Sequence, residues 1–428
     1  MKLVVFAHTP PPHHGQSYMV AQMLAALGPD GALNKVESAA EHIECHHVNA
    51  RLSDDMEDVG RVRPGKILRL LGYCFQAIRC RFRTGANVLY YVPAPGKRGA
   101  LYRDWIVMLL CRPFFDKLVL HWHAVGLGEW LDEEAQAWER GLTLLLLGRA
   151  DVSIVLAEAN RADAARLEPK AIEVVPNGIP DPCPQCERDL VPLRRARSAA
   201  RARLLAGEGV GSGTQPEDDP RIFRVLYLAH ATREKGLFDA VAGVVQANAR
   251  AAELKLPLLF QLSVAGSFAS TSEQREFDAC TEQPGSQTQN LVALNPALRG
   301  LEPMPMLRAL GFVSGEEKPR LLATADAFCF PTFYHAESFG LVVIEAMAAG
   351  LPVIATRWRA IPELLPPNHA ELVPPRAPAE IAECLLRLAR REVDGRELRN
   401  RFLAHFTLEQ HVRLLRAALL RADEGGVA

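Results

Sequence analysis

The sequence lacks any long apolar run and any excess charge of one sign. No stretch approaches the about 20 consecutive apolar residues of a membrane-spanning helix. Lys and Arg number 49 against 50 Asp and Glu, so the charge balance gives no general case for binding nucleic acid. The start, "MKLVVFAHTPPP", has only a short apolar run, which predicts a first strand rather than a signal peptide. The nine cysteines are scattered, as is typical of reduced thiols, so we expect a cytoplasmic protein.

Several motifs of nucleotide and metal chemistry are also missing. There is no Walker loop, and the first loop, "HTPPPHHGQS", offers Gly15 but no Gly-x-Gly-x-x-Gly, so a dinucleotide dehydrogenase is poorly supported. Cys183 and Cys186 form one Cys-x-x-Cys without a second pair at zinc spacing. The "HWH" at 121–123 has no evident partner ligands, and the acids at 217–220 lie in a loop-like segment. We therefore predict no metal site and no cofactor.

What the sequence does contain is an alternation of strand-like and helix-like segments. Such alternation predicts parallel sheets with helices on their faces, an α/β fold. The alternation of strands and helices stops after the first half of the chain and begins again near residue 223. This predicts two Rossmann-like αβ domains around a central cleft. The predicted strands are 2–9, 87–94, 117–125, 152–157, 171–179, 223–230, 260–266, 327–332 and 351–356.

The predicted domain boundaries follow from composition. The first domain covers 1–186, and a second one covers 221–405. Between them, 187–220 begins as a basic helix and becomes a mobile loop rich in Gly, Ser and acids. Residues 281–309 look like an insertion. An amphipathic helix at about 406–424, with Thr407 and Gln410 spaced as a capping box, is expected to pack back on the first domain.

The stretch "YHAESFGLVVIEAMAAGLPVIAT", residues 334–356, places two carboxylates in an apolar run. We expect a helix that is capped by Ser338 and ends at Gly350, followed by a buried strand. The first turn of such a helix favours an anion such as phosphate. Glu345 lies further along the same face as Leu341, where a carboxylate can accept hydrogen bonds from the hydroxyls of a ribose. The alternative is a surface helix with a solvated Glu.

A basic turn follows the first strand of the second half. In "LAHATREKGL", Arg233 and Lys235 come directly after the strand 223–230, at the end of a strand where ligands bind in parallel sheets. Two cations there can neutralise a diphosphate. A solvated charged turn is an equally good interpretation of these residues by themselves.

Taken together, these landmarks resemble a known family. "ESFGLVVIEAMAAGLPVI" is similar to the Glu, seven residues, Glu segment of retaining family-four glycosyltransferases, the glycosyl transferases group 1, which have the GT-B fold. "PPPHHGQS", "HWHAVG", "VVPNGI" and "REKG" resemble other family landmarks in the expected order. The first match is specific, whereas each of the others alone is weak, and together they cover nearly the whole chain.

The resemblance implies a role for each matching residue. Glu345 would hold the ribose, and Glu337 would contact the transferred sugar near its anomeric carbon. Lys235 and Arg233 would carry the charge that develops on the departing diphosphate, and His123 would approach the transferred sugar from the other domain. The residues implied to place backbone N–H groups or a close backbone approach at the donor are Gly15, Ser338, Phe339, Gly340 and Leu341.

The resemblance implies a hexosyltransferase that moves a sugar from a nucleoside-diphosphate sugar to a glycan or lipid-linked acceptor, as in polysaccharide or cell-envelope synthesis. Anomeric configuration would be retained, and fixed cations and helix N–H groups would stabilise the leaving group without a metal. One departure weakens the match: the family's Gly-Arg pair is replaced by Ala229 and His230. The alternatives are another GT-B enzyme, such as an epimerase or a phosphorylase, and a non-catalytic protein that binds a nucleotide sugar. An alternative interpretation of His123 is a histidine that only packs at the end of a strand.

A basic segment, residues 61–103, predicts a peripheral contact with an anionic membrane. From Gly60 to Arg103 there are ten Lys or Arg and no Asp or Glu, and aromatic residues are interleaved. The part "KILRLLGYCFQAIRCRFR" mixes apolar and basic residues as an interfacial helix does. A solvated basic face and an anionic soluble acceptor remain alternatives.

Overall fold

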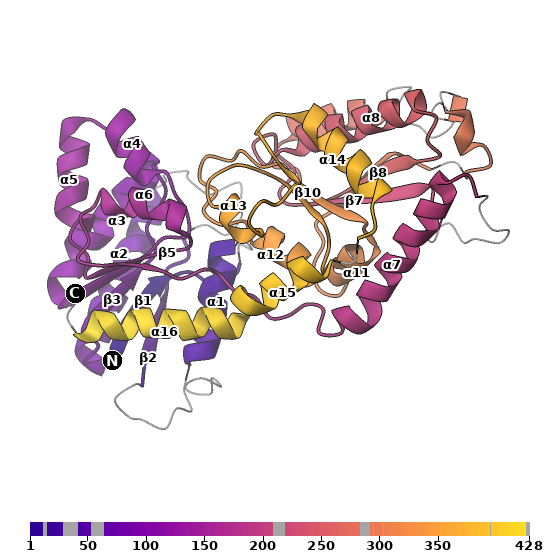
Figure 1. Ribbon diagram of the computed structural model, residues 1–428. Coiled ribbons are helices and arrows are strands. Elements are labelled where there is room, and N and C mark those ends of the chain that lie inside the picture. The colour runs from indigo at the N-terminus through magenta and orange to yellow at the C-terminus, as the bar shows by residue number, and fades with distance from the viewer. Residues whose placement is uncertain are drawn as a thin grey trace. The chain divides into compact units, whose positions relative to one another are not determined.

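The computed structural model describes most of the chain as two compact units. The described residues are 1–11, 15–28, 42–52, 64–208, 219–282, 292–293, 295–302, 304–393 and 395–424. The first unit comprises Met1–Pro180, His335–Phe339 and His405–Ala428, and the second comprises Asp181–Tyr334 and Gly340–Ala404 (Figure 1). The domain limits at 186, 220 and 405 stay a prediction from composition.

The first unit is built on a parallel sheet of six strands in the order β2-β1-β3-β4-β5-β6. Its strands are β1 Lys2–Ala7, β2 Glu44–Asn49, β3 Val88–Tyr91, β4 Lys117–His121, β5 Val152–Val155 and β6 Ile172–Val174. Its helices are α1 Gly15–Leu27, α2 Pro64–Thr84, α3 Arg98–Cys111, η3 Arg112–Phe114, α4 Leu127–Glu133, α5 Ala137–Leu147, η4 Glu158–Asn160, α6 Arg161–Ala165 and α16 Leu408–Glu424.

Helices cover both faces of this sheet, so its central strands are apolar on both sides. Along β1, Val4 and Phe6 face a core shared with α2, α3 and α5, whereas Leu3 and Val5 face a core shared with α1 and α16. Successive side chains of a strand point to opposite faces, which is why neighbouring residues enter different cores. The C-terminal helix α16 thus completes the core of the first unit.

The second unit repeats the architecture with the strand order β12-β11-β10-β7-β8-β9, again all parallel. Its strands are β7 Ile222–Leu228, β8 Leu259–Ala265, β9 Leu307–Gly311, β10 Ala327–Phe330, β11 Val353–Thr356 and β12 Leu372–Val373. Its helices are α7 Cys186–Leu205, α8 Leu237–Glu253, α9 Thr271–Glu282, η7 Pro296–Leu298, α11 Glu317–Thr324, α12 Leu341–Ala348, α13 Ile361–Leu364, α14 Pro378–Arg390 and α15 Arg396–His405.

The strand order of the second unit fixes where a ligand site is expected. The chain runs outward from β7 through β8 to β9, then returns to the other side of β7 and continues through β10 and β11. The order therefore reverses between β7 and β10, which pair directly. In open parallel sheets, ligands bind beyond the carboxyl ends of the strands at this switch point. The loop that follows β7 contains the basic turn, and the segment that follows β10 contains Glu337 and leads into α12, which contains Glu345.

The α/β prediction is confirmed, and the nine strands predicted from sequence are all present. The interpretation of 281–309 as an insertion is wrong in part, because its end belongs to β9, an edge strand with four of its five residues exposed or half-exposed. The predicted basic helix is α7. The predicted mobile loop lies largely outside the described residues, which omit 209–218.

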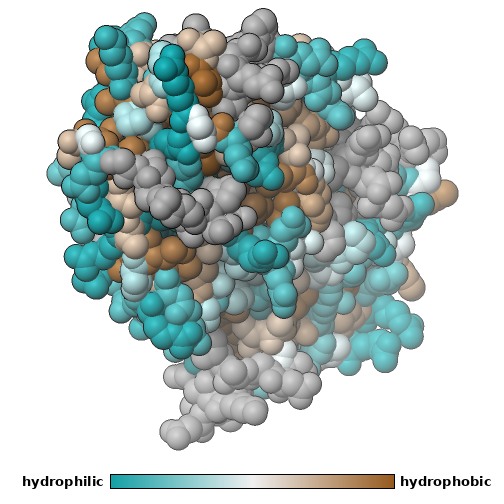
Figure 2. Space-filling view, turned by 90° about the vertical axis from the view of Figure 1, so that its right-hand side faces the viewer, coloured by the Kyte–Doolittle hydropathy of each residue, from teal (hydrophilic) through white to brown (hydrophobic). Residues whose placement is uncertain are grey.

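The surface of the second unit carries hydrophilic side chains over much of the face in Figure 2, with small hydrophobic patches between them. In the part of the chain that the structure describes, no helix combines the length and the apolar character needed to span a bilayer.

Candidate functional site

The loops after β7 and β10 are fastened to each other within the second unit. The backbone N–H of Phe333 donates to the carbonyl of Glu234 at 2.8 Å, and the Thr332 hydroxyl lies 3.4 Å from the same oxygen. Gly236 has φ +82°, and a Cβ there would lie 2.1 Å from the carbonyl oxygen of Pro331. Only glycine therefore lets the two loops approach this closely.

Lys235 belongs to the loop after β7, and its side chain extends toward the end of β10 and the loop after it. Its ammonium is 4.6 Å from the ring centre of Tyr334 and 5.8 Å from that of Phe330, so a cation rests against two aromatic faces. The Tyr227 hydroxyl reaches the carbonyl of Lys235 at 3.3 Å from inside the sheet and holds the turn in place. The predicted basic residue is thus positioned at the switch point.

The Arg233 side chain contacts a different part of the second unit. Its guanidinium pairs with Glu276 of α9 and lies 4.6 Å from the ring centre of Phe238. Its backbone N–H donates to the carboxylate of Glu273 at 2.8 Å. These two acids offset its positive charge, so Lys235 is the better candidate to neutralise a diphosphate.

His230, which stands where the family has an arginine, does not replace that charge. Burial, and secondarily the charge of Lys235, lowers the pKa of its imidazole. A histidine with a lowered pKa is neutral at physiological pH. The turn after β7 therefore offers one well-placed cation, Lys235, and a neutral imidazole.

Helix α12 begins at the predicted place but with a different cap. Gly340 is the N-cap in the left-handed conformation, with φ +87°, and no side chain of the described residues caps the helix. The prediction that Ser338 caps it is wrong: its hydroxyl donates instead to the carbonyl of His123 at 2.7 Å. The predicted end is confirmed, since Gly350 has φ +60° and donates its N–H to Met347 at 2.8 Å.

Glu345 lies one turn into α12, and its two carboxylate oxygens have different surroundings. Oε1 accepts a hydrogen bond from the Lys318 ammonium of α11 at 2.6 Å. Oε2 is buried and has no hydrogen-bond partner among the described residues. Burial raises the pKa of the Glu345 carboxyl, and Lys318 counteracts part of that rise. The solvated alternative is wrong, because the Glu345 side chain is only 15% exposed.

In the first unit, His123 follows the carboxyl end of β4. Its ring lies 4.2 Å from that of His121, centre to centre, and the buried His121 in turn hydrogen-bonds through Nδ1 to the Tyr90 hydroxyl. Burial lowers the pKa of His121 well below its usual value, with the charges of His123 and His411 adding to the effect. His121 is therefore a neutral packing partner, and His123 is the half-exposed member of the pair.

The segment His335–Phe339, which includes the first glutamate, groups with the first unit. Besides the bond from Ser338 to His123, the Asn160 amide donates to the carbonyl of Ser338 at 2.8 Å. Glu337 is buried in this segment, and Phe339 packs edge-on against Phe406 of the same unit.

Gly15 is the first residue of α1 and is exposed. The preceding residues 12–14 of the first loop lie outside the described part.

The structure thus divides the predicted site residues into two sets. The predicted site residues that lie in the first unit are Gly15, His123, Glu337, Ser338 and Phe339; the other predicted site residues lie in the second unit. Those in the second are Arg233, Lys235, Gly340, Leu341 and Glu345. Sequence reasoning missed Lys318 and Tyr334, which contact Glu345 and Lys235.

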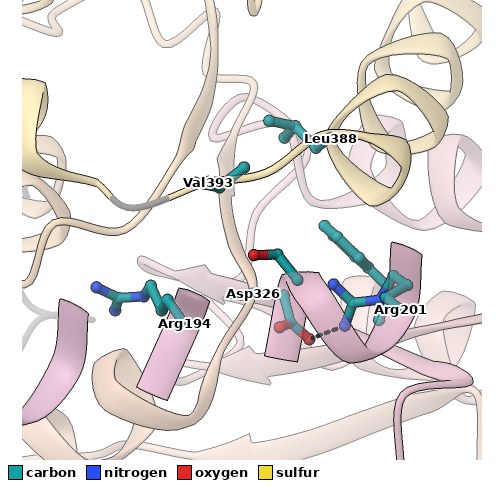
Figure 3. A pocket seen from close by; sticks show the side chains of 7 residues that line it. Arg194, Arg201, Asp326, Leu388 and Val393 are labelled. Carbon is teal, nitrogen blue, oxygen red and sulfur yellow. Dashed lines mark ion pairs between the residues drawn. The ribbon is translucent and has the colours of Figure 1, made fainter. Parts of the chain in front are cut away.

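A separate hollow in the second unit has room for about one water molecule, at about 10 Å³. Figure 3 shows the ion pair of Arg201 and Asp326 at its edge, with the two side chains 3.2 Å apart. Asp326 also accepts the backbone N–H of Arg224 at 2.8 Å. This hollow contains none of the predicted site residues, and its ion pair joins α7 to the sheet.

Comparison with known proteins gives a family match over part of the chain. Residues 272–391 match the family model of the glycosyl transferases group 1. The match covers less than a third of the chain, so it shows a segment that is similar to this family. This segment includes Glu337 and Glu345 and ends before the last two helices of the chain.

Curated relatives match the chain over short alignments. The MMP alpha-(1->4)-mannosyltransferase of Mycolicibacterium hassiacum is 42% identical over 89 residues, which is 20% of either chain. The phosphatidyl-myo-inositol mannosyltransferase of Mycobacterium leprae is 38% identical over 99 residues, 23% of this chain and 25% of that protein. The alignments thus span about a fifth to a quarter of these relatives' lengths.

Solved structures match the fold over almost the whole chain. Anabaena HepE in complex with UDP has a TM-score of 0.59 at 17% identity, and the alignment covers 98% of this chain and 99% of that one. The same protein in complex with UDP-glucose has a TM-score of 0.58 at 15% identity, with coverages of 97% and 99%. At these identities the likeness concerns the fold alone, and the GT-B prediction is confirmed.

Proposed function

We propose that the chain transfers a hexose from a nucleoside-diphosphate sugar to a glycan or lipid-linked acceptor, with retention of anomeric configuration and without a metal. The observation that carries the proposal is Glu345: a mostly buried carboxylate in α12, the helix that follows β10, with one oxygen that has no hydrogen-bond partner among the described residues. A ribose hydroxyl is a suitable donor for that oxygen, since buried polar atoms in native proteins are almost always hydrogen-bonded.

Other groups of the second unit suit the rest of such a donor. The first turn of α12 and the Lys235 ammonium together provide N–H groups and a positive charge for a diphosphate. The N–H groups and the ammonium interact more strongly with the diphosphate as negative charge develops on it during its departure. This is electrostatic catalysis. The roles of Glu337 and His123 at the transferred sugar remain predictions from the family resemblance.

The relatives' names support the choice of substrates. Several are called mannosyltransferases, one of them a phosphatidyl-myo-inositol mannosyltransferase, and HepE is described with UDP and with UDP-glucose. A hexose donor and a glycan or glycolipid acceptor follow as part of the proposal for this chain.

Thermal unfolding with a panel of nucleoside-diphosphate hexoses tests donor binding. A ligand that binds the folded state at 100 times its Kd stabilises it by about 2.7 kcal/mol. We expect at least one donor to raise Tm and to be slowly hydrolysed. A panel in which no donor raises Tm or is hydrolysed would contradict the proposal.

A non-catalytic nucleotide-sugar binder is the second candidate, and His230 is the observation that favours it. The lowered pKa of His230 leaves the turn without the second cation of the family pattern. A binder of this kind would give the Tm increase but no hydrolysis and no transfer, so the two readouts of the panel separate the candidates.

An anionic membrane surface is the proposed location of the acceptor, with helix α2 as the contact at the inner face of the membrane. Leu68, Leu71, Phe75 and Phe82 lie on one side of α2 and are exposed, whereas Leu70 and Cys74 on the other side are buried. Arg69, Arg79 and Arg83 are exposed on the same helix. Exposed apolar and basic residues together suit an interface with anionic lipid. The first residues of the predicted segment, 61–63, lie outside the described part.

A further inference from the structure

Lys318 is an ion-pair partner that no part of the proposed donor chemistry uses. It is the second residue of α11, and its ammonium contacts Glu345 Oε1 at 2.6 Å across the 27 residues that separate them. The Lys318 side chain is 30% exposed and that of Glu345 is 15% exposed. Two exposed acids, Glu316 and Glu317, precede Lys318 in the chain, yet its ammonium is paired with the more buried carboxylate.

The pair leaves the carboxylate asymmetric. An ammonium is a compact point charge, so it can hold one oxygen without covering the other, whereas a guanidinium tends to engage both. Oε2 is buried and unpartnered among the described residues. Burial raises the pKa of the Glu345 carboxyl, and the charge and hydrogen bond of Lys318 oppose part of that rise in favour of the charged form.

We infer that Lys318 is a positioning residue: it holds Glu345 Oε1 so that Oε2 faces a ribose hydroxyl of the donor. The inference rests on the proposed function, and it assigns to Lys318 an effect that acts through Glu345 rather than through direct contact with the nucleotide. The alternative, in which Lys318 itself contacts the base or a phosphate, is an outcome of the test.

A double-mutant cycle on nucleotide affinity tests this inference. UDP, GDP and ADP are titrated into the full-length chain, and the tightest of them is compared in Lys318→Met, Glu345→Gln and the double variant. We expect Lys318→Met to weaken binding about 10-fold, and to have almost no further effect once Glu345 is Gln, since coupled residues are not additive. Lys318→Arg should restore little of the affinity, because a guanidinium tends to engage both carboxylate oxygens and would cover Oε2.

The hydroxyls of the ribose give a readout that a purely structural role would not change. In the unaltered chain, the 2′,3′-dideoxy form of the same nucleotide should bind more weakly than the ribonucleotide. Lys318→Met should reduce that difference, because it disturbs the group that recognises the hydroxyls. Lys170→Met is the matched control: it removes a lysine paired with Asp151 at 2.7 Å in the first unit and should leave both affinities unchanged.

The possible failures are distinguishable. Additive effects of Lys318→Met and Glu345→Gln, or an undiminished preference for the ribonucleotide in Lys318→Met, would overturn this inference and leave the proposed function standing. Unchanged affinity in Glu345→Gln, or binding of none of the three nucleotides, would overturn both. Circular dichroism and Tm of each variant show whether it is folded, and a loss of affinity counts only in a folded variant.

Discussion

At the scale of single residues, Glu345 and Lys235 are proposed to act on different parts of one donor. Glu345 faces the ribose, which changes little during transfer, whereas Lys235 faces a diphosphate whose charge increases as it leaves. Interactions made equally in the ground state and the transition state affect KM, and those that strengthen in the transition state affect kcat. The two residues should therefore have separable kinetic effects.

We predict that Glu345→Gln raises the donor KM with little effect on kcat. A hydrogen bond to a charged group is worth roughly 1.5–3 kcal/mol, which corresponds to about 10- to 150-fold in KM. Lys235→Ala should instead lower kcat more than it raises KM. Steady-state kinetics of both folded variants measure the split, and near-normal constants in both would rule out the assignment.

We predict that donor binding weakens on acidification, starting at a higher pH than for an ordinary glutamate. Burial raises the pKa of Glu345, so its carboxyl gains a proton, and loses its negative charge, earlier as the pH falls. A nucleotide sugar should be used because a free diphosphate itself titrates near neutrality. In Glu345→Gln this part of the pH dependence of Kd should vanish; if it persists, another group is responsible.

The residue-level predictions from sequence succeeded where neighbouring residues decide the geometry. Gly350 ends α12 as its spacing indicates, and the basic turn follows β7. Ser338 does not cap α12, because Gly340, two residues later, adopts the left-handed conformation that starts the helix. Lys318 was not identified, because its pairing with Glu345 depends on how α11 packs beside α12 and not on sequence spacing.

At the scale of elements, the approach of the loops after β7 and β10 positions Lys235. We predict that Gly236→Ala destabilises the second unit and weakens donor binding. The left-handed φ costs roughly 1–2 kcal/mol for a non-glycine residue, and the contact with Pro331 adds an overpacking cost of about 1–3 kcal/mol. Gly207→Ala is the control, since Gly207 has φ +94° but nothing within 4 Å of a Cβ.

Thermal unfolding and donor titration distinguish these two variants. Gly207→Ala should show only the backbone cost, with donor affinity unchanged, whereas Gly236→Ala should lose both stability and affinity. Equal changes in Tm and in affinity for the two variants would show that the close approach of the loops has no role in the site.

Helix α2 supplies the second element-scale prediction. Phe75→Ser and Phe82→Ser should each reduce binding to anionic vesicles about 10-fold, because burying a Phe side chain is worth about 1.5–3 kcal/mol. Phe312→Ser is the control, since Phe312 is 63% exposed, close to the 67% of Phe75, but lies in the second unit. Co-sedimentation measures binding, which should also weaken with added salt.

Failure of the unaltered chain to sediment with anionic vesicles at low salt would contradict the membrane contact. An equal loss in Phe312→Ser would show that the effect of the α2 substitutions is not specific to that helix.

Elements with a buried apolar core were predictable, whereas three of the four edge strands, β2, β9 and β12, were not. Strands such as β1 and β7 are apolar on both faces and were recognised from their sequence. β2, "ECHHVN", is a polar edge strand with one buried residue, and β12 has two residues, so neither gives a periodic signal. β9 follows a segment rich in Pro and has one buried residue among its five, so it too gives no clear periodic signal.

At the scale of the whole molecule, two parallel sheets and their switch points follow from the alternation of strands and helices, but the chemistry depends on a few side chains. The HepE structures with this fold share only 15–17% sequence identity with the chain, and a fold by itself does not determine substrates. The donor and the acceptor must therefore be tested directly. The same holds for the metal requirement, which the fold does not determine.

We predict that transfer is unaffected by a chelator such as EDTA and is not increased by added Mg²⁺ or Mn²⁺. The reason is that Lys235 and the N–H groups of α12 are proposed to stabilise the leaving diphosphate without a cation. Transfer assays with chelated and metal-supplemented enzyme measure this. Activity that is lost on chelation and restored by a divalent cation would contradict it.

The most direct test of the central claim is a titration of nucleoside-diphosphate hexoses into the unaltered chain and into Glu345→Gln, with hydrolysis measured in the same samples. The account predicts that at least one donor binds and is slowly hydrolysed, and that Glu345→Gln, while folded, binds it about 10- to 150-fold more weakly. Equal donor affinity in the two proteins would contradict the claim that the switch point between β7 and β10 is the donor site.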